Sequence, residues 1–183
     1  MEMRDFCQKT FRVLLNCMAR PGTVGKLDSL SHLVSHWPFP SLSLLLYTLM
    51  DRWVSFSVVG DENYERFLRE LTGAKPTSLD RADFVVFLGS TRGLLSEVKV
   101  GSYESPEEGA FCVYYMSRFE SRSRVLLQGP GIEGSLVLST PLEREELLTL
   151  SKVNSLFPLG VDLILLEEGK LFCLPRSTRL EVL

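Results

Sequence analysis

The 183-residue sequence has few of the side chains on which enzyme chemistry most often depends. Its two histidines, His32 and His36, are four residues apart, which is the spacing of two zinc ligands on a helix. No glutamate stands between them as in an HExxH motif, and no third ligand is obvious nearby. The chain also lacks the GxSxG segment that marks a nucleophile elbow. These absences argue against a metal centre and against a histidine-assisted nucleophile.

Cysteine is scarce as well. The four cysteines are Cys7, Cys17, Cys112 and Cys173, and no two of them form a CxxC pair. Cys7 and Cys17 fall on one predicted helix, where their separation in the sequence corresponds to about 15 Å between Cα atoms. A disulfide requires Cα atoms within about 7 Å of each other. We therefore expect reduced, mostly buried thiols in a cytoplasmic protein.

Long apolar runs are missing. The longest, from Leu42 to Met50, is interrupted by Ser43 and Thr48, and it is far shorter than the roughly 20 residues that a membrane-spanning helix needs. Charged residues also interrupt the N-terminal region, which therefore does not resemble a signal peptide. We expect a soluble, intracellular chain with no membrane partner.

The sequence shows no basic stripe. The net charge is −3, and the 20 lysines and arginines are spread along the chain. The richest basic stretch holds Arg118, Arg122 and Arg124, is interrupted by Glu120, and is typical of a solvated turn. Because binding to a nucleic-acid duplex needs clustered basic side chains that displace counterions, we expect no nucleic-acid partner. With 45% hydrophobic and 23% charged residues, the composition is that of a globular protein.

Hydrophobic periodicity divides the chain into helices and strands. Helices are predicted over 4–19, 42–51, 62–72 and about 141–155, with a short one at 92–98. Strands are predicted over 53–59, 83–89, 111–117, 124–128, 161–166 and 170–174. The alternation in the middle and the antiparallel end predict one α/β domain, residues 1–183, with a mixed β-sheet flanked by helices on both faces.

The first predicted helix has a broad apolar face at spacings of three and four residues, as a helix packed on a core has. The members of this face are Phe6, Phe11, Val13, Leu14, Leu15, Cys17 and Met18. The helix is expected to end at Pro21-Gly22, because proline disfavours helical backbone at the residue before it.

Local signals place two further helix starts. Asp61 is a fair N-cap for one helix, which Gly73 ends. Thr140 is expected to cap another helix, with Pro141 in its first turn and Glu143 closing a capping box.

One glycine-rich segment imitates a nucleotide-binding motif. GPGIEG places Gly129, Gly131 and Gly134 in the spacing GxGxxG and follows a predicted strand. A dinucleotide fingerprint continues into a helix that holds the pyrophosphate, but here the extended segment SLVLS follows. We interpret GPGIEG as a tight turn, either structural or facing a ligand.

Four patches carry a resemblance to a known family. They are FRVLLNCMARPGTV at 11–24, LLYTLMDRW at 45–53, EEGAFCVYY with LLQGPGI across 107–132, and FPLGVDLILLEEGKLFCLPRSTRLEV at 157–182. Together they extend over nearly the whole chain in the family's order. On these motifs the chain resembles the PhnH family of the bacterial carbon–phosphorus lyase system.

The resemblance implies a fold related to the large domain of pyridoxal-phosphate-dependent transferases, without the cofactor, and a cytoplasmic homodimer. It implies assembly with PhnG, PhnI and PhnJ, and joint function with PhnL. The implied role is that of an accessory or structural subunit in forming α-D-ribose 1-methylphosphonate 5-triphosphate from ATP and methylphosphonate. An independent pyridoxal enzyme is disfavoured, since no lysine lies in a patch typical of a cofactor-binding turn.

The resemblance also directs attention to residues that could bind a ligand or form an interface. These residues are Arg20, Gly22, Thr48, Asp51, Gly129, Gly131, Asp162 and Arg176. An alternative function is a nucleotide or phosphonate site at a dimer cleft, with Arg20 and Arg176 binding the anion. The competing interpretation of each arginine is a structural salt bridge or a charge at a helix C-terminus.

Overall fold

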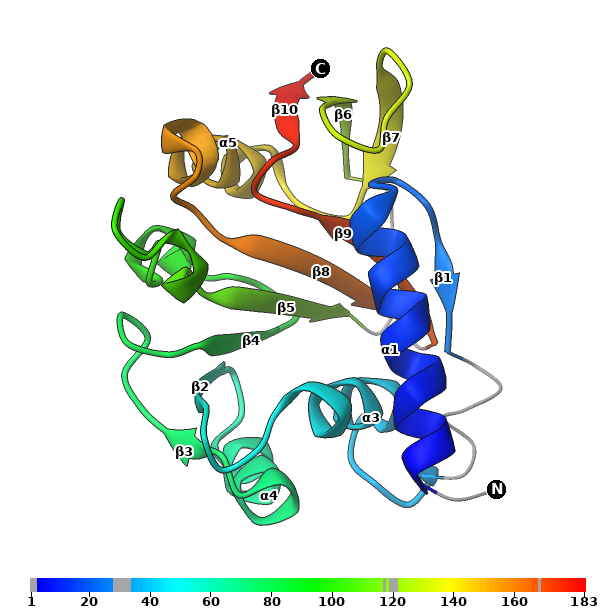
Figure 1. Ribbon diagram of the computed structural model, residues 1–183, viewed down its shortest axis with the longest axis vertical. Coiled ribbons are helices and arrows are strands. Elements are labelled where there is room, and N and C mark those ends of the chain that lie inside the picture. Colours follow the sequence, from blue (N-terminus) through cyan, green and yellow to red (C-terminus); the bar gives the residue numbers. More distant parts are fainter. Residues whose placement is uncertain (1–2, 28–33, 117, 119–121, 168) are drawn as a thin grey trace.

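The computed structural model describes residues 3–27, 34–116, 118, 122–167 and 169–183. Its α-helices are α1 (Met3–Ala19), α3 (Pro40–Leu49), α4 (Glu62–Thr72) and α5 (Arg144–Val153), and its 3-10 helices are η2 (Leu94–Glu97), η3 (Pro106–Glu108) and η4 (Asn154–Leu156) (Figure 1). The four long helices expected from the sequence are confirmed to within a few residues, and the short helix expected at 92–98 is the 3-10 helix η2. No helix in the described ranges is long and apolar enough to cross a membrane.

The main sheet is mixed and has seven strands. Along the chain these are β1 (Gly25–Lys26), β2 (Ser55–Val59), β3 (Lys75–Pro76), β4 (Phe84–Leu88), β5 (Phe111–Met116), β8 (Asp162–Glu167) and β9 (Lys170–Leu174). Their order across the sheet is β1-β9-β8-β5-β4-β2-β3. The strands from β3 to β8 are parallel, and β9 runs antiparallel to both of its neighbours. The expected α/β class and mixed sheet are confirmed.

The two faces of this sheet bury two separate apolar clusters. Because side chains alternate along a strand, Val86 packs with α1, α3 and α4 on one face, whereas Val85 packs with η2 and α5 on the other. Figure 1 shows α1 crossing the sheet in front of β8 and β9. Helices therefore flank both faces, as the sequence predicted.

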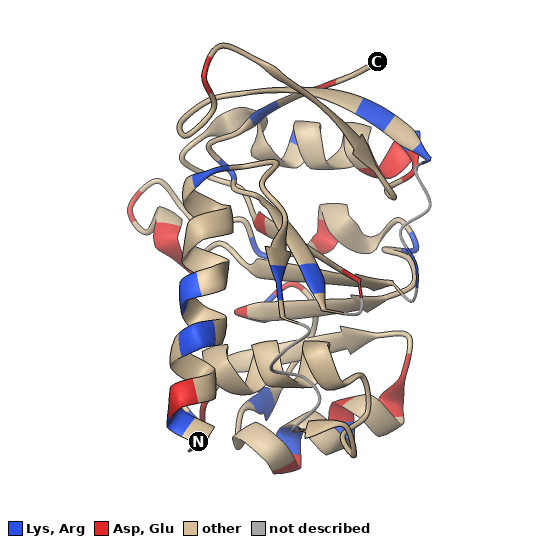
Figure 2. Ribbon diagram, turned by 90° about the vertical axis from the view of Figure 1, so that its right-hand side faces the viewer, with Lys and Arg blue, Asp and Glu red and all other residues tan. Residues whose placement is uncertain are grey.

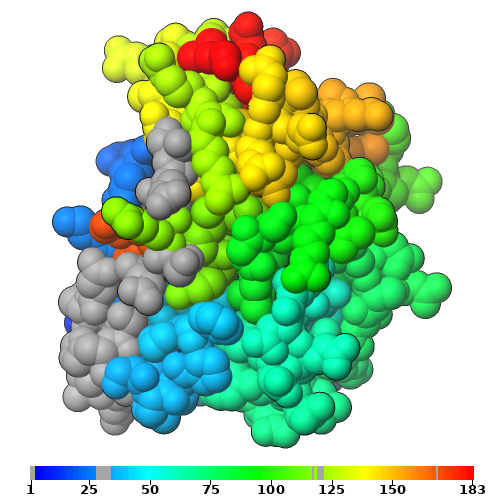
Figure 3. Space-filling model, turned by 180° about the vertical axis from the view of Figure 1, so that it is seen from behind, coloured from blue at the N-terminus to red at the C-terminus, as the bar shows by residue number. Residues whose placement is uncertain are grey.

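A second sheet has three antiparallel strands. It packs with α5 in the same apolar cluster, on one face of the main sheet. Its order is β10 (Arg179–Val182), β6 (Ser123–Gln128), β7 (Leu136–Thr140). From behind, the C-terminal residues lie at the top beside the β7–α5 segment (Figure 3). Strand β10 was not expected from the sequence, because it is defined by pairing with β6, more than fifty residues earlier in the chain.

The helix α4 begins and ends where local signals predicted. The Asp61 carboxylate accepts hydrogen bonds from the backbone N–H groups of Asn63 and Tyr64 at 2.8 and 3.1 Å. Gly73 ends the helix in the left-handed conformation, with φ 73°. Both contacts satisfy backbone groups that a helix end leaves without intrahelical partners.

The cap expected at Thr140 is wrong. Thr140 is the last residue of β7, held extended by pairing with Ser123, and its hydroxyl accepts a hydrogen bond from the N–H of Leu142 at 3.2 Å. Glu143 is the N-cap of α5, and the Glu146 carboxylate returns to accept from the Glu143 N–H at 3.1 Å. The capping box therefore forms three residues later, with a carboxylate in place of the threonine hydroxyl.

The first helix is only partly covered. Phe6, Leu14 and Cys17 are buried against the core, but Phe11 and Leu15 are 43% and 51% exposed. The broad apolar face expected of this helix is thus wider than the part of it that the other described residues cover.

Candidate functional site

A pocket of about 790 Å³ opens between three segments. They are Gly129-Pro130 after β6, the end of α5 with η4 and Phe157, and residues 174–180 between β9 and β10. Pockets that hold small molecules commonly have volumes of about 300–1,000 Å³. This pocket is therefore the candidate functional site of the described chain.

Arg176 forms one wall of the pocket and is held by Asp162. Its Nη2 and Nε atoms donate to Asp162 Oδ2 at 2.7 and 3.1 Å, and its backbone N–H donates to Asp162 Oδ1 at 2.9 Å. Both side chains are mostly buried. The ion pair fixes the loop after β9 to the start of β8.

The same guanidinium also holds the loop before β5. Arg176 donates to the carbonyl oxygens of Pro106 and Gly109 at 2.5 and 3.2 Å. A Cβ on Gly109 would lie 2.3 Å from the Gly160 carbonyl oxygen and 2.5 Å from Arg176 Nη1, so only glycine fits there. The structural salt bridge, one of the two interpretations left open for Arg176, is thus present. Most N–H donors of the Arg176 guanidinium bind groups within the chain.

Three of the predicted site residues, Arg20, Gly22 and Gly131, lie at a second location, where the end of α1 contacts the turn between β6 and β7. Gly131 has φ 81°, and a Cβ there would stand 2.1 Å from the Ala19 carbonyl oxygen. A Cβ on Gly22 would stand 2.3 Å from Leu136 Cδ2. Arg20 is exposed beside this contact. Gly131 permits two backbone segments to approach closely, and Gly22 leaves room for the Leu136 side chain, so both glycines have a structural use.

Gly129 joins this turn to the pocket. A Cβ at Gly129, where φ is 141°, would lie 2.8 Å from the Ser177 carbonyl oxygen. The turn is therefore structural and also lines the pocket, and the extended β7 that follows it excludes a dinucleotide fingerprint.

Thr48 and Asp51 lie in a third place, at the end of α3. The Thr48 hydroxyl donates to the Leu44 carbonyl oxygen at 2.7 Å, and the Asp51 carboxylate accepts from the Trp53 N–H at 2.8 Å. Both contacts are local, and Figure 1 shows α3 in the opposite half of the molecule from α5 and β10. The structure does not bring these two residues to the pocket.

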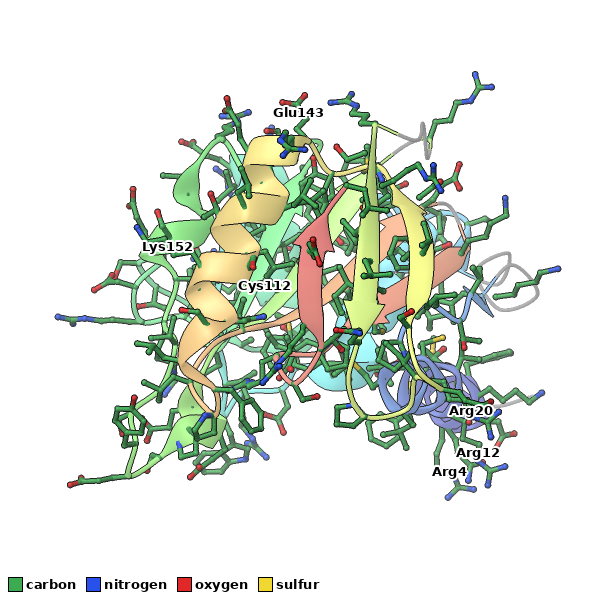
Figure 4. The ribbon with its side chains drawn as sticks, turned by 90° about the horizontal axis from the view of Figure 1, so that it is seen from above. Arg4, Arg12, Arg20, Cys112, Glu143 and Lys152 are labelled. Carbon is green, nitrogen blue, oxygen red and sulfur yellow. The ribbon has the colours of Figure 1, made fainter. Side chains whose placement is uncertain are left out.

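The described cysteines form no reactive cluster. Cys17, Cys112 and Cys173 are buried, Cys7 is half-buried, and all four are free thiols. Burial raises the pKa of the Cys112 thiol, which lies in the core between the sheet and α5 (Figure 4). A thiol whose thiolate is disfavoured in this way is a poor nucleophile.

The remaining candidates from the sequence have simple outcomes. His36 is exposed, and its companion His32 lies outside the described residues, as does Glu120. Within the described ranges no group of three or more histidine, cysteine, aspartate and glutamate side chains is placed to hold a metal ion.

A family model described as bacterial phosphonate metabolism protein (PhnH) matches residues 2–181. The chain belongs to the PhnH family. It is 33% identical over 176 residues to "Putative C-P lyase subunit protein HtxG" of Stutzerimonas stutzeri, covering 96% of this chain and 86% of the relative. It is 29% identical over 181 residues to "Alpha-D-ribose 1-methylphosphonate 5-triphosphate synthase subunit PhnH" of Rhizobium meliloti (strain 1021), covering 95% and 90% of the two chains.

Sequence reasoning missed pocket residues that lie within or near the PhnH-like patches. Thr178 is 7% exposed, and its hydroxyl has no hydrogen-bond partner in the described structure. Arg179 is exposed, and Phe157 stands 61% exposed at the same pocket. The Asn154 side chain accepts a hydrogen bond from the Val161 N–H at 2.8 Å and donates one to the Val161 carbonyl oxygen at 3.1 Å. The segment LPRST contained part of the signal, but only the fold shows that its residues line a pocket together with Asn154 and Phe157.

Proposed function

We propose that this chain is an accessory subunit of a carbon–phosphorus lyase assembly in phosphonate catabolism. In that role it supports formation of α-D-ribose 1-methylphosphonate 5-triphosphate from ATP and methylphosphonate. The observation that carries the proposal is the PhnH match across nearly the whole chain, together with relatives whose names describe subunits.

The geometry supports a structural contribution. Three loops are joined by contacts of Arg176, Asp162 and Gly109. Gly131 makes the close contact with the end of α1. These residues hold the shape of the surface, and the Arg176 guanidinium donates to groups of the chain itself.

The proposal includes a fold related to the large domain of pyridoxal-phosphate-dependent transferases, without bound cofactor. It also includes a cytoplasmic location, homodimers of the isolated chain, assembly with PhnG, PhnI and PhnJ, and joint function with PhnL. The seven-stranded mixed sheet with an antiparallel strand next to its edge supports the fold, and the family membership supports the partners.

Co-expression tests the main proposal. The tagged chain is expressed with the PhnG, PhnI and PhnJ proteins encoded in the same genome, and native mass spectrometry measures what co-purifies. We expect a stoichiometric complex, and we expect deletion of this chain to abolish growth on methylphosphonate as the phosphorus source. Absence of a complex together with normal growth would refute the role.

A second candidate function, binding of an anionic nucleotide or phosphonate, is favoured by the pocket itself. The pocket is lined by apolar residues, including Leu150 and Phe157, and by the polar residues Ser177 and Arg179. Arg179 suits an anion better than Arg176, because Asp162 already neutralises Arg176.

Calorimetric titration of ATP and of methylphosphonate into the purified chain tests this second candidate. We expect measurable heat that is lost in Arg179→Gln and kept in Arg124→Gln, an exposed arginine on the neighbouring β6. Equal heats for the two variants, or no heat with either compound, would refute a ligand site at Arg179.

A further inference from the structure

The outer side of α1 is an apolar and basic surface that the described chain does not cover. Phe11 and Leu15 are one helical turn apart and are 43% and 51% exposed. Leu136, which is 36% exposed, lies next to the end of α1, because its side chain lies against Gly22. Exposed apolar side chains that stand singly are ordinary, but neighbours in a row mark an interaction surface.

Basic residues accompany this row. From Met3 to Arg20 the only acidic side chain is Asp5, whereas Arg12 and Arg20 are both exposed. Figure 2 shows the basic bands along α1, and Figure 4 shows the Arg12 and Arg20 side chains pointing away from the body on the same side as that of Arg4. The chain as a whole carries a net charge of −3, so the positive charge of this helix is a local property.

We infer that the surface formed by Phe11, Arg12, Leu15, Arg20 and Leu136, here called the α1 surface, binds an amphipathic helix of another subunit, whose apolar row is flanked by acidic side chains. The inference rests on the proposed role in a multi-subunit assembly. An exposed helix with a row at four-residue spacing offers the ridges and grooves into which a second helix packs. The local positive charge selects acidic flanks and excludes basic ones.

The length of α1 suits such a partner. Its 17 residues extend for about 25 Å, so a partner helix of similar length could cover the whole row. Packing would remove Phe11 and Leu15 from water, and the arginines would lie at the rim of the interface. Rim charges act mainly through association rate and salt dependence, which supplies a signature separate from apolar packing.

Reconstitution with the co-expressed PhnG, PhnI and PhnJ proteins tests the inference. We expect Arg12→Glu with Arg20→Glu, and separately Leu15→Ser, to weaken binding of this chain by at least about 10-fold, the loss typical of important interface residues. The charge variant should also flatten the dependence of affinity on salt. Its matched control is Arg66→Glu with Arg69→Glu on the exposed side of α4, and the control for Leu15→Ser is Leu148→Ser, 50% exposed on α5.

The outcomes separate this inference from the proposed function. If the unaltered chain forms no complex, the proposed function fails and the inference fails with it. If the unaltered chain assembles and the α1 variants assemble equally well, the inference alone is wrong. Unfolding midpoints of the variants, measured in urea, establish that they remain folded.

A photo-crosslinking residue at position 15 identifies the occupant. We expect the crosslinked peptide to come from another subunit and to be an acidic amphipathic helix. A crosslink to a second copy of this chain, or binding to phosphatidylglycerol vesicles that Arg12→Glu with Arg20→Glu abolishes while assembly is unchanged, would overturn the inference.

Discussion

Arg176 lies where three loops meet, and its guanidinium donates to the Asp162 carboxylate and to two backbone carbonyl oxygens. Arg20 stands exposed on the surface where α1 ends, and within the described residues its side chain forms no comparable ion pair. Both are arginines in PhnH-like patches, and both were candidates for binding an anion. The same side chain is a structural tie in one region and a surface charge in the other.

The comparison shows that burial determines how much a charged side chain contributes to stability. Removing one member of a buried ion pair leaves the other unpaired in a medium that solvates it poorly. An exposed charge keeps its water, so its removal changes stability little. Variants that distinguish these two situations test the interpretation of both regions.

The largest effect is expected at the buried pair. Arg176→Ala should lower the free energy of unfolding by about 3–5 kcal/mol, because Asp162 and two carbonyl oxygens lose their donor. Urea unfolding followed by circular dichroism measures the loss. Asp162→Ala and the double variant complete a thermodynamic cycle, in which additive losses would contradict the coupling that the geometry describes.

The second-largest loss of stability is expected at Gly131, which contacts the end of α1 next to Arg20. Gly131→Ala should cost about 2–3 kcal/mol, because strain at φ 81° is joined by a clash with the Ala19 carbonyl oxygen. Gly134→Ala is the matched control, since φ there is 67° and nothing lies within 4 Å of its Cβ position. It should cost about 1 kcal/mol. Equal losses in thermal unfolding would show that the close approach to α1 is unimportant.

A second ion pair, between Asp83 and Lys99, is only partly buried and sharpens the comparison through its pH dependence. Burial of Asp83 raises its pKa, but hydrogen bonds from Lys99 at 2.5 Å and from Ser55 at 2.7 Å outweigh that effect, so the pKa is lowered overall. A carboxylate whose pKa is lower in the folded than in the unfolded chain stabilises the fold at pH values above its unfolded-state pKa. This stabilisation is lost as the pH falls through its folded-state pKa.

Below about pH 5 the unaltered chain should therefore lose stability more steeply than Asp83→Asn, whose side chain does not titrate. Urea midpoints measured across this acidic range provide the check. Parallel pH profiles for the two proteins would mean that the Asp83 contacts do not favour its ionised form.

The smallest effect is expected at Arg20. Arg20→Gln should change the free energy of unfolding by no more than about 0.5 kcal/mol, because the side chain is exposed. Urea unfolding beside Arg176→Ala makes the comparison direct. A loss above about 1 kcal/mol would reveal a structural role for Arg20 and would weaken the case that it faces a partner.

Elements defined by neighbours in the sequence were predictable. Asp61 and Gly73 mark both ends of α4, and the β8–β9 hairpin follows from two apolar runs separated by a short turn. The misplacement of the cap at Thr140 shows the limit of such signals. Thr140 is a good cap by its local sequence, but pairing with Ser123 keeps it in β7, and Glu143 caps α5 instead.

The candidate site was predictable only in part. The PhnH resemblance pointed to Asp162 and Arg176, but it could not show that each is the other's partner. Thr178 and Arg179 were missed because their importance comes from facing a pocket whose other walls, near Pro130 and Leu150, lie far away in the sequence.

By itself, the sequence determined the α/β class, the helices and most of the strands, and the family, since periodicity, capping residues and motif order are properties of neighbouring residues. The tertiary structure alone decided that Arg176 is a buried tie, that β10 joins β6, and that Phe11 and Leu15 remain uncovered. The physical reason is that burial and pairing depend on which distant segments meet, and an arginine in the sequence does not show whether a carboxylate or water will surround it.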